Sequence, residues 1–188
     1  MKDYNIKALS IETWTSFERL VEKHNGVWGG CWCTYFHLKP PEHERSSEAN
    51  KRFKEKLVEE GKTHAALVFH EELCVAWCQF GSPQELPDIY HKKEVLSKTM
   101  LPDWRITCFF VDKDYRRKGL SAIALEGALK LIEGMGGGVI ESYPQDTQGK
   151  NAPSSFLYNG TRQIFEKVGF KYEGIKGKNH CIMRISVS

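Results

Sequence analysis

The sequence predicts a single α+β domain over residues 1–188, and three observations support this fold class. Segments with the apolar spacing of helices are interspersed with β-branched and aromatic segments typical of strands. A strand–loop–helix–strand unit occupies the middle of the chain, over about residues 104–143. The length of 188 residues and an apolar content of 40% suit one domain with a substantial core.

The first half of the sequence predicts two helices and up to three strands. Residues 10–24 have apolar side chains at helical spacing, and an Asn-Gly pair ends this helix. Residues 27–36 are rich in aromatic side chains and predict a strand or an extended loop. A strongly charged helix with one narrow apolar stripe is expected over 46–60. Two strands joined by a short turn follow, over residues 64–70 and 73–80.

The second half of the sequence predicts the most regular elements. Residues 104–111 are β-branched and aromatic, which is typical of a central strand. The loop 112–119 leads into an apolar helix over 120–133. A segment rich in Pro, Ser, Gly and Asn lies over 144–155. The other predicted elements are a helix near 160–168 and strands near 139–143, 170–174 and 180–187.

Composition and charge argue against several classes of function. The net charge of +3 is too small for the dense basic face of a nucleic-acid-binding protein. No stretch approaches the ~18 apolar residues that cross a bilayer, and the N-terminal residues lack the apolar core of a signal peptide. We therefore expect a cytoplasmic protein without a nucleic-acid or membrane partner, in which the six cysteines are reduced thiols.

The loop between the central strand and the apolar helix carries the strongest functional signal. A helix N-terminus has unpaired N–H groups and the positive end of a dipole, so it favours an anion. Gly119 has no Cβ, which lets a phosphate approach the backbone closely. Arg116, Arg117 and Lys118 add positive charge at the same place. The segment 116–121 therefore predicts a site for an anionic ligand rather than a solvated basic turn.

The pattern Arg116-x-x-Gly119-x-Ser121, between a strand ending in Val and an apolar helix, resembles the binding loop of the GCN5-related N-acetyltransferases (GNATs). The family pattern is Gln/Arg-x-x-Gly-x-Gly/Ala, so Ser121 is small but departs from it. The segment 161–170, which ends in Gly-Phe, looks like the family's late helix. The resemblance covers most of the chain and is sharpest over 104–175.

This resemblance implies a three-layer α/β arrangement, in which helices flank a mixed, mostly antiparallel central sheet. It also implies acetyl-CoA as co-substrate and no metal, with the pantetheine arm on a splayed strand and the pyrophosphate on the loop amides. Among the residues that the resemblance implies, Val111 would polarise the thioester oxygen with its backbone N–H. The cofactor-binding residues implied are Phe109, Phe110, Val111, Arg116, Arg117, Lys118, Gly119, Leu120, Ser121, Asn151 and Ser154.

The same resemblance implies direct attack of a primary amine of a small-molecule acceptor on the thioester, and family habit favours a homodimer. An alkyl ammonium has a pKa near ~10.4, so the amine needs a base. Glu141 is the expected base, with His180 as the alternative. Many family members have a tyrosine that acts as general acid where this chain has Phe165. Tyr158 is its expected replacement as the acid, Tyr143 is an alternative, and catalysis without an acid stays open.

An aromatic wall for the acceptor is expected after the first helix, where the family commonly places one. Trp28, Trp32 and Tyr35 are the residues expected to form it, because aromatic faces bind apolar or cationic groups.

The cysteines of this segment suggest a second interpretation. In an extended strand Cys31 and Cys33 would share a face and, with His37, supply three zinc ligands. No fourth ligand is evident, so buried thiols that act as small apolar groups are the expectation. Two alternatives to catalysis therefore stay open: a catalytically weak acyl-CoA-binding module, which Phe165 favours, and a metal- or thiol-based sensor.

Overall fold

The computed structural model describes residues 4–90, 92, 93, 95, 100–147 and 157–188. Its centre is a sheet whose strands are β1 (Tyr4–Ala8), β2 (His64–His70), β3 (Leu73–Gly81), β4 (Trp104–Val111), β5 (Gly138–Ser142), β6 (Lys171–Lys176) and β7 (His180–Val187). The strands follow the order β1-β2-β3-β4-β5-β7-β6. β4 and β5 pair in parallel, and the other neighbours in the described sheet are antiparallel. The predicted mixed, mostly antiparallel sheet is confirmed.

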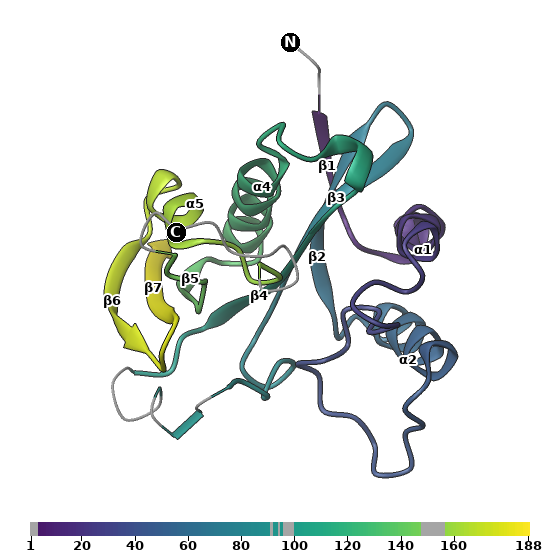
Figure 1. The fold of residues 1–188 in the computed structure, drawn as a ribbon, viewed down its shortest axis with the longest axis horizontal. Coiled ribbons are helices and arrows are strands. Elements are labelled where there is room, and N and C mark those ends of the chain that lie inside the picture. Colours follow the sequence, from purple (N-terminus) through teal and green to yellow (C-terminus); the bar gives the residue numbers. More distant parts are fainter. Residues whose placement is uncertain (1–3, 91, 94, 96–99, 148–156) are drawn as a thin grey trace.

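Helices cover both faces of the sheet, which gives three layers (Figure 1). α1 (Trp14–Lys23) and α2 (Ser47–Glu59) lie on one face, and α4 (Leu120–Gly134) and α5 (Arg162–Lys167) lie on the other. Short 3-10 turns, η1 (Ile11–Thr13) and η2 (Lys113–Tyr115), come before α1 and α4. None of the helices in the described part of the chain is both long enough and apolar enough to cross a membrane.

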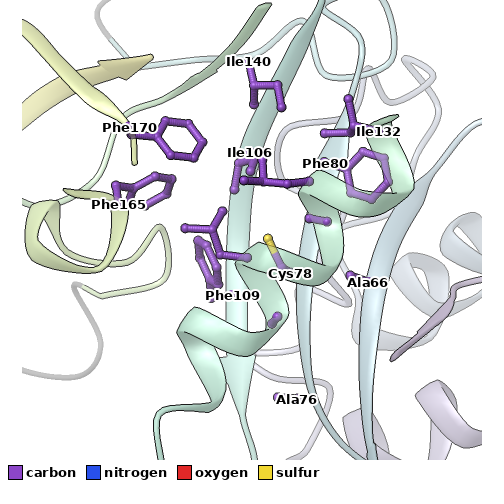
Figure 2. Packing of buried hydrophobic residues seen from close by; sticks show 14 of the residues in the cluster. Ala66, Ala76, Cys78, Phe80, Ile106, Phe109, Ile132, Ile140, Phe165 and Phe170 are labelled. Atoms are coloured by element: carbon purple, nitrogen blue, oxygen red, sulfur yellow. The ribbon is translucent and has the colours of Figure 1, made fainter. Parts of the chain in front are cut away.

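Two hydrophobic cores form because successive side chains of a strand point to opposite faces. In β2, Ala66 and Val68 pack toward α4, whereas Leu67 and Phe69 pack toward α1. Figure 2 shows the α4 side, where Phe165 joins the strand side chains from α5.

A β-bulge in β4 reverses this alternation beside the functional loop. The β3–β4 register shifts so that Cys108 pairs with Gln79 and Ile106 with Phe80, which leaves Thr107 as the extra residue. Ile106 consequently faces the α4 core, while Cys108 faces the α1 side. Without the bulge, both side chains would lie on the same face.

Sequence and structure differ at two N-terminal segments. β1 is an edge strand that sequence reasoning missed, because it is short and its burial pattern is largely exposed. Residues 27–36, predicted as a strand or an extended loop, instead form a series of tight turns. The predicted strand is therefore wrong there, because the segment winds through the left-handed conformation at Val27, Trp28, Trp32 and Cys33.

Candidate functional site

The site begins where β4 and β5 separate. The two strands pair only from Trp104 to Ile106, and the Ser142 hydroxyl donates to the Ile106 carbonyl (3.0 Å) at the last paired position. β5 ends at Ser142, whereas β4 continues to Val111. The C-terminal half of β4 therefore presents one backbone edge to a gap in the sheet.

Hydrogen bonding determines which amides face this gap. The Asp112 N–H donates to the Val75 carbonyl of β3 (2.9 Å). Because neighbouring N–H groups of a strand point to opposite sides, the Val111 N–H points away from β3 and into the gap. The Phe109 N–H points the same way and donates to the Tyr158 carbonyl (2.5 Å). The amide of Val111 thus points into the gap, and its role as an oxyanion donor stays a prediction, while the amide of Phe109 is already engaged by Tyr158.

The turn after β4 is fixed by a charged anchor. Asp112 accepts a hydrogen bond from the Asp114 N–H (3.0 Å), which caps η2. The Lys23 ammonium of α1 reaches both carboxylates, at 2.8 Å and 2.7 Å. Burial raises the pKa of Asp112, but the hydrogen bond from Lys23 outweighs this effect and leaves that pKa below its usual value. The anchor ties the start of the loop to the opposite layer of the fold.

The end of the loop forms a concave set of amides. Arg117 and Gly119 have φ of 61° and 77°, so the backbone curls before α4 begins. Alternating left-handed and right-handed residues create anion-binding hollows of this kind. The N–H of Ala122 donates to the Gly119 carbonyl (3.0 Å), so the amides before it lie ahead of the helical hydrogen bonding. A Cβ on Gly119 would meet no protein atom within 4 Å, which leaves its surface open to a ligand.

A cavity of ≈ 350 Å³ connects this loop with the open edge of β4. We call it the loop cavity. It contains eight of the predicted cofactor-binding residues. Its lining residues are Trp28, Phe109, Phe110, Val111, Arg116, Arg117, Gly119, Leu120, Ser121, Ala122, Leu157, Ile164 and Lys167.

Three of the predicted cofactor-binding residues are not placed in the loop cavity. Lys118 turns away from it: its ammonium donates to the Asp114 carbonyl (3.0 Å) and lies over the Tyr115 ring. Only its backbone amide could therefore take part in the predicted binding, and that role stays a prediction. Asn151 and Ser154 lie outside the described residues.

A smaller pocket of ≈ 180 Å³ adjoins the loop cavity. We call it the aromatic pocket. Trp28 lines both spaces, and its ring meets that of Tyr158 edge-on with centroids 6.5 Å apart. The lining residues of the aromatic pocket are Trp28, Cys31, Cys33, Tyr35, Phe36, Tyr90, Cys108 and Tyr158. A ligand on the edge of β4 and a second ligand in the aromatic pocket would therefore meet beside Trp28.

Three solved structures resemble the chain over nearly its whole length. A protein of the GNAT family from Desulfovibrio desulfuricans is 15% identical, with 99% of this chain and 100% of that chain covered and a TM-score of 0.54. An N-acetyltransferase from Staphylococcus aureus Mu50 is 12% identical, with 99% of both chains covered and a TM-score of 0.55. The PaiA N-acetyltransferase from Thermoplasma acidophilum, solved in complex with coenzyme A, is 17% identical, with 98% of this chain and 99% of that chain covered and a TM-score of 0.51. The chain has the GNAT fold.

This similarity lies in the fold rather than in the sequence. No model of a protein family matches the chain, and neither does any curated protein. Apart from the missed strand β1 and the strand wrongly expected over 27–36, the predicted elements occur in the observed order, and the loop cavity lies at the point where β4 and β5 part.

The turns around residues 25–33 supply part of the wall of the aromatic pocket. Val27 has φ of 55°, which is strongly unfavourable for a β-branched residue. Asn50 of α2 holds the segment, because its amide nitrogen donates to the Gly30 carbonyl (2.8 Å) and its oxygen accepts from Thr34 (3.2 Å). Backbone strain of about 1–3 kcal/mol per residue persists only where the surroundings enforce it, and it clusters at functional sites.

Two of the three predicted wall residues line the pocket. Trp28 and Tyr35 are partly exposed, and both line the aromatic pocket. Trp32 is 3% exposed, and its indole N–H donates to the Ser47 hydroxyl (3.0 Å) at the start of α2. The prediction for Trp32 is therefore corrected: it packs in the core and lines neither space.

The predicted base, Glu141, also has a different environment from the one expected. Its side chain is fully buried in β5, 2.5 Å from the Arg184 guanidinium of β7, and it accepts a hydrogen bond from Tyr143 (2.5 Å). Glu141 lines neither the loop cavity nor the aromatic pocket. This arrangement is that of a structural ion pair, because a paired and inaccessible carboxylate has no path to an acceptor amine. The alternative base, His180, lines neither space either.

The two aromatic residues considered for acid catalysis have separate roles. Phe165 is fully buried and packs edge-on against Phe109 and Phe170, so the position of the family's tyrosine is part of the core. Tyr158 lines the aromatic pocket, and burial raises its pKa to about 12. Its phenol is therefore neutral near pH 7 and can donate a hydrogen bond.

Sequence reasoning missed Phe36, Tyr90 and Cys108 as lining residues of the aromatic pocket. Phe36 belongs to an aromatic run that reads as core, and Cys108 is directed to the pocket only by the bulge at Thr107. Among the described residues, no group of three or more His, Cys, Asp or Glu side chains is placed to hold a metal ion.

Proposed function

We propose that this protein is an N-acetyltransferase, which transfers the acetyl group of acetyl-CoA to a primary amine of a small molecule. One observation carries this proposal: an amide-lined cavity on a parted strand edge meets an aromatic pocket at a shared residue, Trp28. The N-acetyltransferase from Staphylococcus aureus and the coenzyme A-bound enzyme from Thermoplasma acidophilum have the same fold.

The donor would occupy the loop cavity. The pyrophosphate suits the amides of Arg117 to Ser121, where the start of α4 adds its dipole. The side chains of Arg116, Arg117 and Lys167 add positive charge around the same space. The Val111 N–H then lies where it can stabilise the negative charge that develops on the thioester oxygen, and such a fixed donor acts mainly in the transition state.

The acceptor would occupy the aromatic pocket. Its lining is aromatic and thiol side chains, and among the described lining residues there is no carboxylate. A polyamine, whose several charges require carboxylate partners, is therefore disfavoured. A small amine with an apolar or aromatic body fits the size of ≈ 180 Å³ and the chemistry of the walls.

Tyr158 is proposed to hydrogen-bond the sulfur of the departing coenzyme A. Its pKa of about 12 makes it a weaker acid than a thiol, whose pKa is about 8.5. Complete proton transfer to the leaving thiolate is thus unfavourable. Tyr158 would stabilise the thiolate as a donor without giving up its proton, which a phenol in a dry pocket does well.

A panel of amines tests the function, with release of the coenzyme A thiol as the readout. Arylalkylamines, alkylamines, polyamines and amino acids would be compared at equal concentration, with melting temperatures recorded in acetyl-CoA. We expect a rise in melting temperature and turnover that is highest for small apolar amines. A rise without any turnover would favour the acyl-CoA-binding module, for which Phe165 is the supporting feature. No rise in melting temperature would refute the donor site itself.

A further inference from the structure

A third cavity, of ≈ 780 Å³, shares two lining residues with the aromatic pocket and none with the loop cavity. We call it the basic cavity. Its polar and aromatic lining residues are Tyr35, Lys39, His43, Arg45, Asp88 and Tyr90. A ligand in this cavity could therefore extend from the aromatic pocket, where the acceptor is proposed to bind, but does not share a wall with the donor.

The two shared residues, Tyr35 and Tyr90, form a rim between the aromatic pocket and the basic cavity. Their ring centroids lie 5.5 Å apart, so the rings are in contact and leave no passage between them. Both side chains are about half exposed, at 51% and 48%. The Asp88 N–H donates to the Phe36 carbonyl (3.3 Å), which holds the two chain segments of the rim together. A ligand could lie across this rim with one end in each space.

Asn50 of α2 draws two basic side chains together at the basic cavity. Its amide nitrogen donates to the Gly30 carbonyl (2.8 Å), which fixes the orientation of the amide. The amide oxygen then accepts from the Lys39 ammonium (3.0 Å) and lies 2.9 Å from Nε2 of His43. Because an amide oxygen can only accept, this Nε2 carries a hydrogen. Asn50 thus orders the basic cavity and the turns beside the aromatic pocket at once.

The cations of the basic cavity have no anionic partner within the described part of the chain. Asn50 offers Lys39 a neutral oxygen, and neither Lys39 nor Arg45 pairs with a described carboxylate. Asp88 is the one carboxylate among the described lining residues, and it forms no ion pair with them. Cations gathered around a hollow attract an anion, and their hydrogen bonds to a carboxylate or a phosphate are strong.

The aromatic pocket differs from the basic cavity in its charge. Among its described lining residues there is no Lys, Arg or His. An anionic group next to the reacting amine would therefore be buried there without a partner, which is costly. An anionic group at the far end of the acceptor's apolar body would instead reach the basic cavity across the rim.

We propose that the acceptor is a small amine whose apolar body carries an anionic group, a carboxylate or a phosphate, at the end remote from the amine. This inference rests on the proposed function. The amine and the apolar body occupy the aromatic pocket, and the anionic group lies in the basic cavity. Lys39 and Arg45 bind it by charge-assisted hydrogen bonds, with the Nε2 hydrogen of His43 as a third donor.

Matched pairs of amines test the inference in the wild-type protein, with release of the coenzyme A thiol as the readout. 4-(2-Aminoethyl)benzoate and 4-(2-aminoethyl)benzamide differ only in the charge of the remote group. We expect kcat/KM to be about tenfold or more higher for the benzoate. This preference should shrink as salt is added, because partly exposed charges are screened. Tyramine phosphate and tyramine form the second pair, and the pair with the larger ratio identifies the preferred anion.

The position of the anion is tested by phenylalanine, whose carboxylate lies next to the amine. It should be acetylated no faster than 2-phenylethylamine, because the aromatic pocket offers that carboxylate no cation. A clear preference for phenylalanine would overturn the remote placement.

Two variants of the basic cavity test the residues, with Lys130→Met as the control. Lys130 of α4 is exposed and lines none of the three cavities. Lys39→Met should lower kcat/KM about tenfold for the benzoate through KM, and leave the benzamide and kcat unchanged, because the anion is remote from the reacting atoms. Asp88→Asn removes a like charge and should raise kcat/KM for the benzoate by up to about fivefold. Structural damage does not produce such a rise.

The outcomes separate this inference from the proposed function. If wild type acetylates no amine, the proposed function fails, and the inference fails with it. If wild type is active but treats the members of both pairs alike, the inference alone fails. It also fails if Lys39→Met lowers kcat/KM for the benzoate and the benzamide by the same factor. The rise in melting temperature with acetyl-CoA should be the same in every variant, since the donor shares no wall with the basic cavity.

Discussion

The loop before α4 can be tested by placing a large side chain at Gly119. This residue has φ of 77° and nothing within 4 Å of the position of a Cβ, so a tryptophan there fits the protein but fills the space over the amides. Gly61, after α2, is a matched control because it has φ of 64°, nothing within 4 Å and no place in either cavity. Both substitutions force a bulky residue into the left-handed region, at a cost of about 1–2 kcal/mol.

The two variants should differ only when the donor is present. Blocking two charge-assisted hydrogen bonds, each worth about 1.5–3 kcal/mol, should weaken binding by about 10²–10⁴-fold. Acetyl-CoA at about 100 times its Kd stabilises a protein by about 2.7 kcal/mol, or roughly 5–11 °C for a chain of this length. At the same concentration, Gly119→Trp should keep a rise of about 2 °C or less.

Thermal melts with and without acetyl-CoA measure this difference, and titration calorimetry gives the Kd directly. Without ligand, Gly119→Trp and Gly61→Trp should melt at similar temperatures below wild type. With ligand, the control should recover the full wild-type rise. A Gly119→Trp protein that binds acetyl-CoA as tightly as wild type would show that the ligand does not lie on these amides, and the donor site would have to be elsewhere.

Three further perturbations test the surroundings of the site. Burial, aided by the charge of Lys54, lowers the pKa of His37 to about 3. Below pH ~6.5 the imidazole of His37 therefore takes up a proton in the unfolded chain but not in the native state. The free energy of unfolding should consequently fall by about 1.4 kcal/mol per pH unit below that pH. Urea titrations should detect this fall, and His37→Gln should flatten it; an equal slope in the variant would contradict the assignment. Arg184→Met leaves the buried Glu141 carboxylate without its ion-pair partner, so the free energy of unfolding measured in urea should fall by about 3–5 kcal/mol. A fall of less than about 1 kcal/mol would mean that the ion pair is exposed to solvent. Trp28→Ala should raise KM for both donor and acceptor, and an effect on one alone would place Trp28 in a single cavity.

The sequence was most informative where local signals agree with one another. Strand 104–111, the glycine-bearing loop and the helix that begins at Leu120 could be predicted because β-propensity, a basic turn and helical periodicity occur in immediate succession. The anion-binding role proposed for Gly119 follows from the same local geometry. The observed φ of 77° is one that glycine alone adopts without strain.

The parts that sequence reasoning placed wrongly depend on contacts distant in the chain. Trp32 was assigned to the acceptor wall, but Ser47 on α2 draws its indole into the core. Glu141 was assigned as the base, yet Arg184, which is 43 residues away in sequence, neutralises it inside the sheet. Neither Ser47 nor Arg184 can be recognised from the sequence around Trp32 or Glu141. A charge pattern on a strand cannot reveal whether the neighbouring strand supplies an opposite charge.

The bulge at Thr107 connects these findings, because it explains how one strand serves both reactants. Strict alternation would direct Ile106 and Cys108 to the same face of the sheet. The extra residue instead keeps Ile106 against α4 and turns Cys108 toward α1, into the same hydrophobic cluster as Cys33. The backbone edge of β4 beyond the bulge faces the loop cavity, while Cys108 faces the aromatic pocket. A thioester bound on that edge and an amine in the aromatic pocket would therefore meet beside Trp28, which lines both spaces.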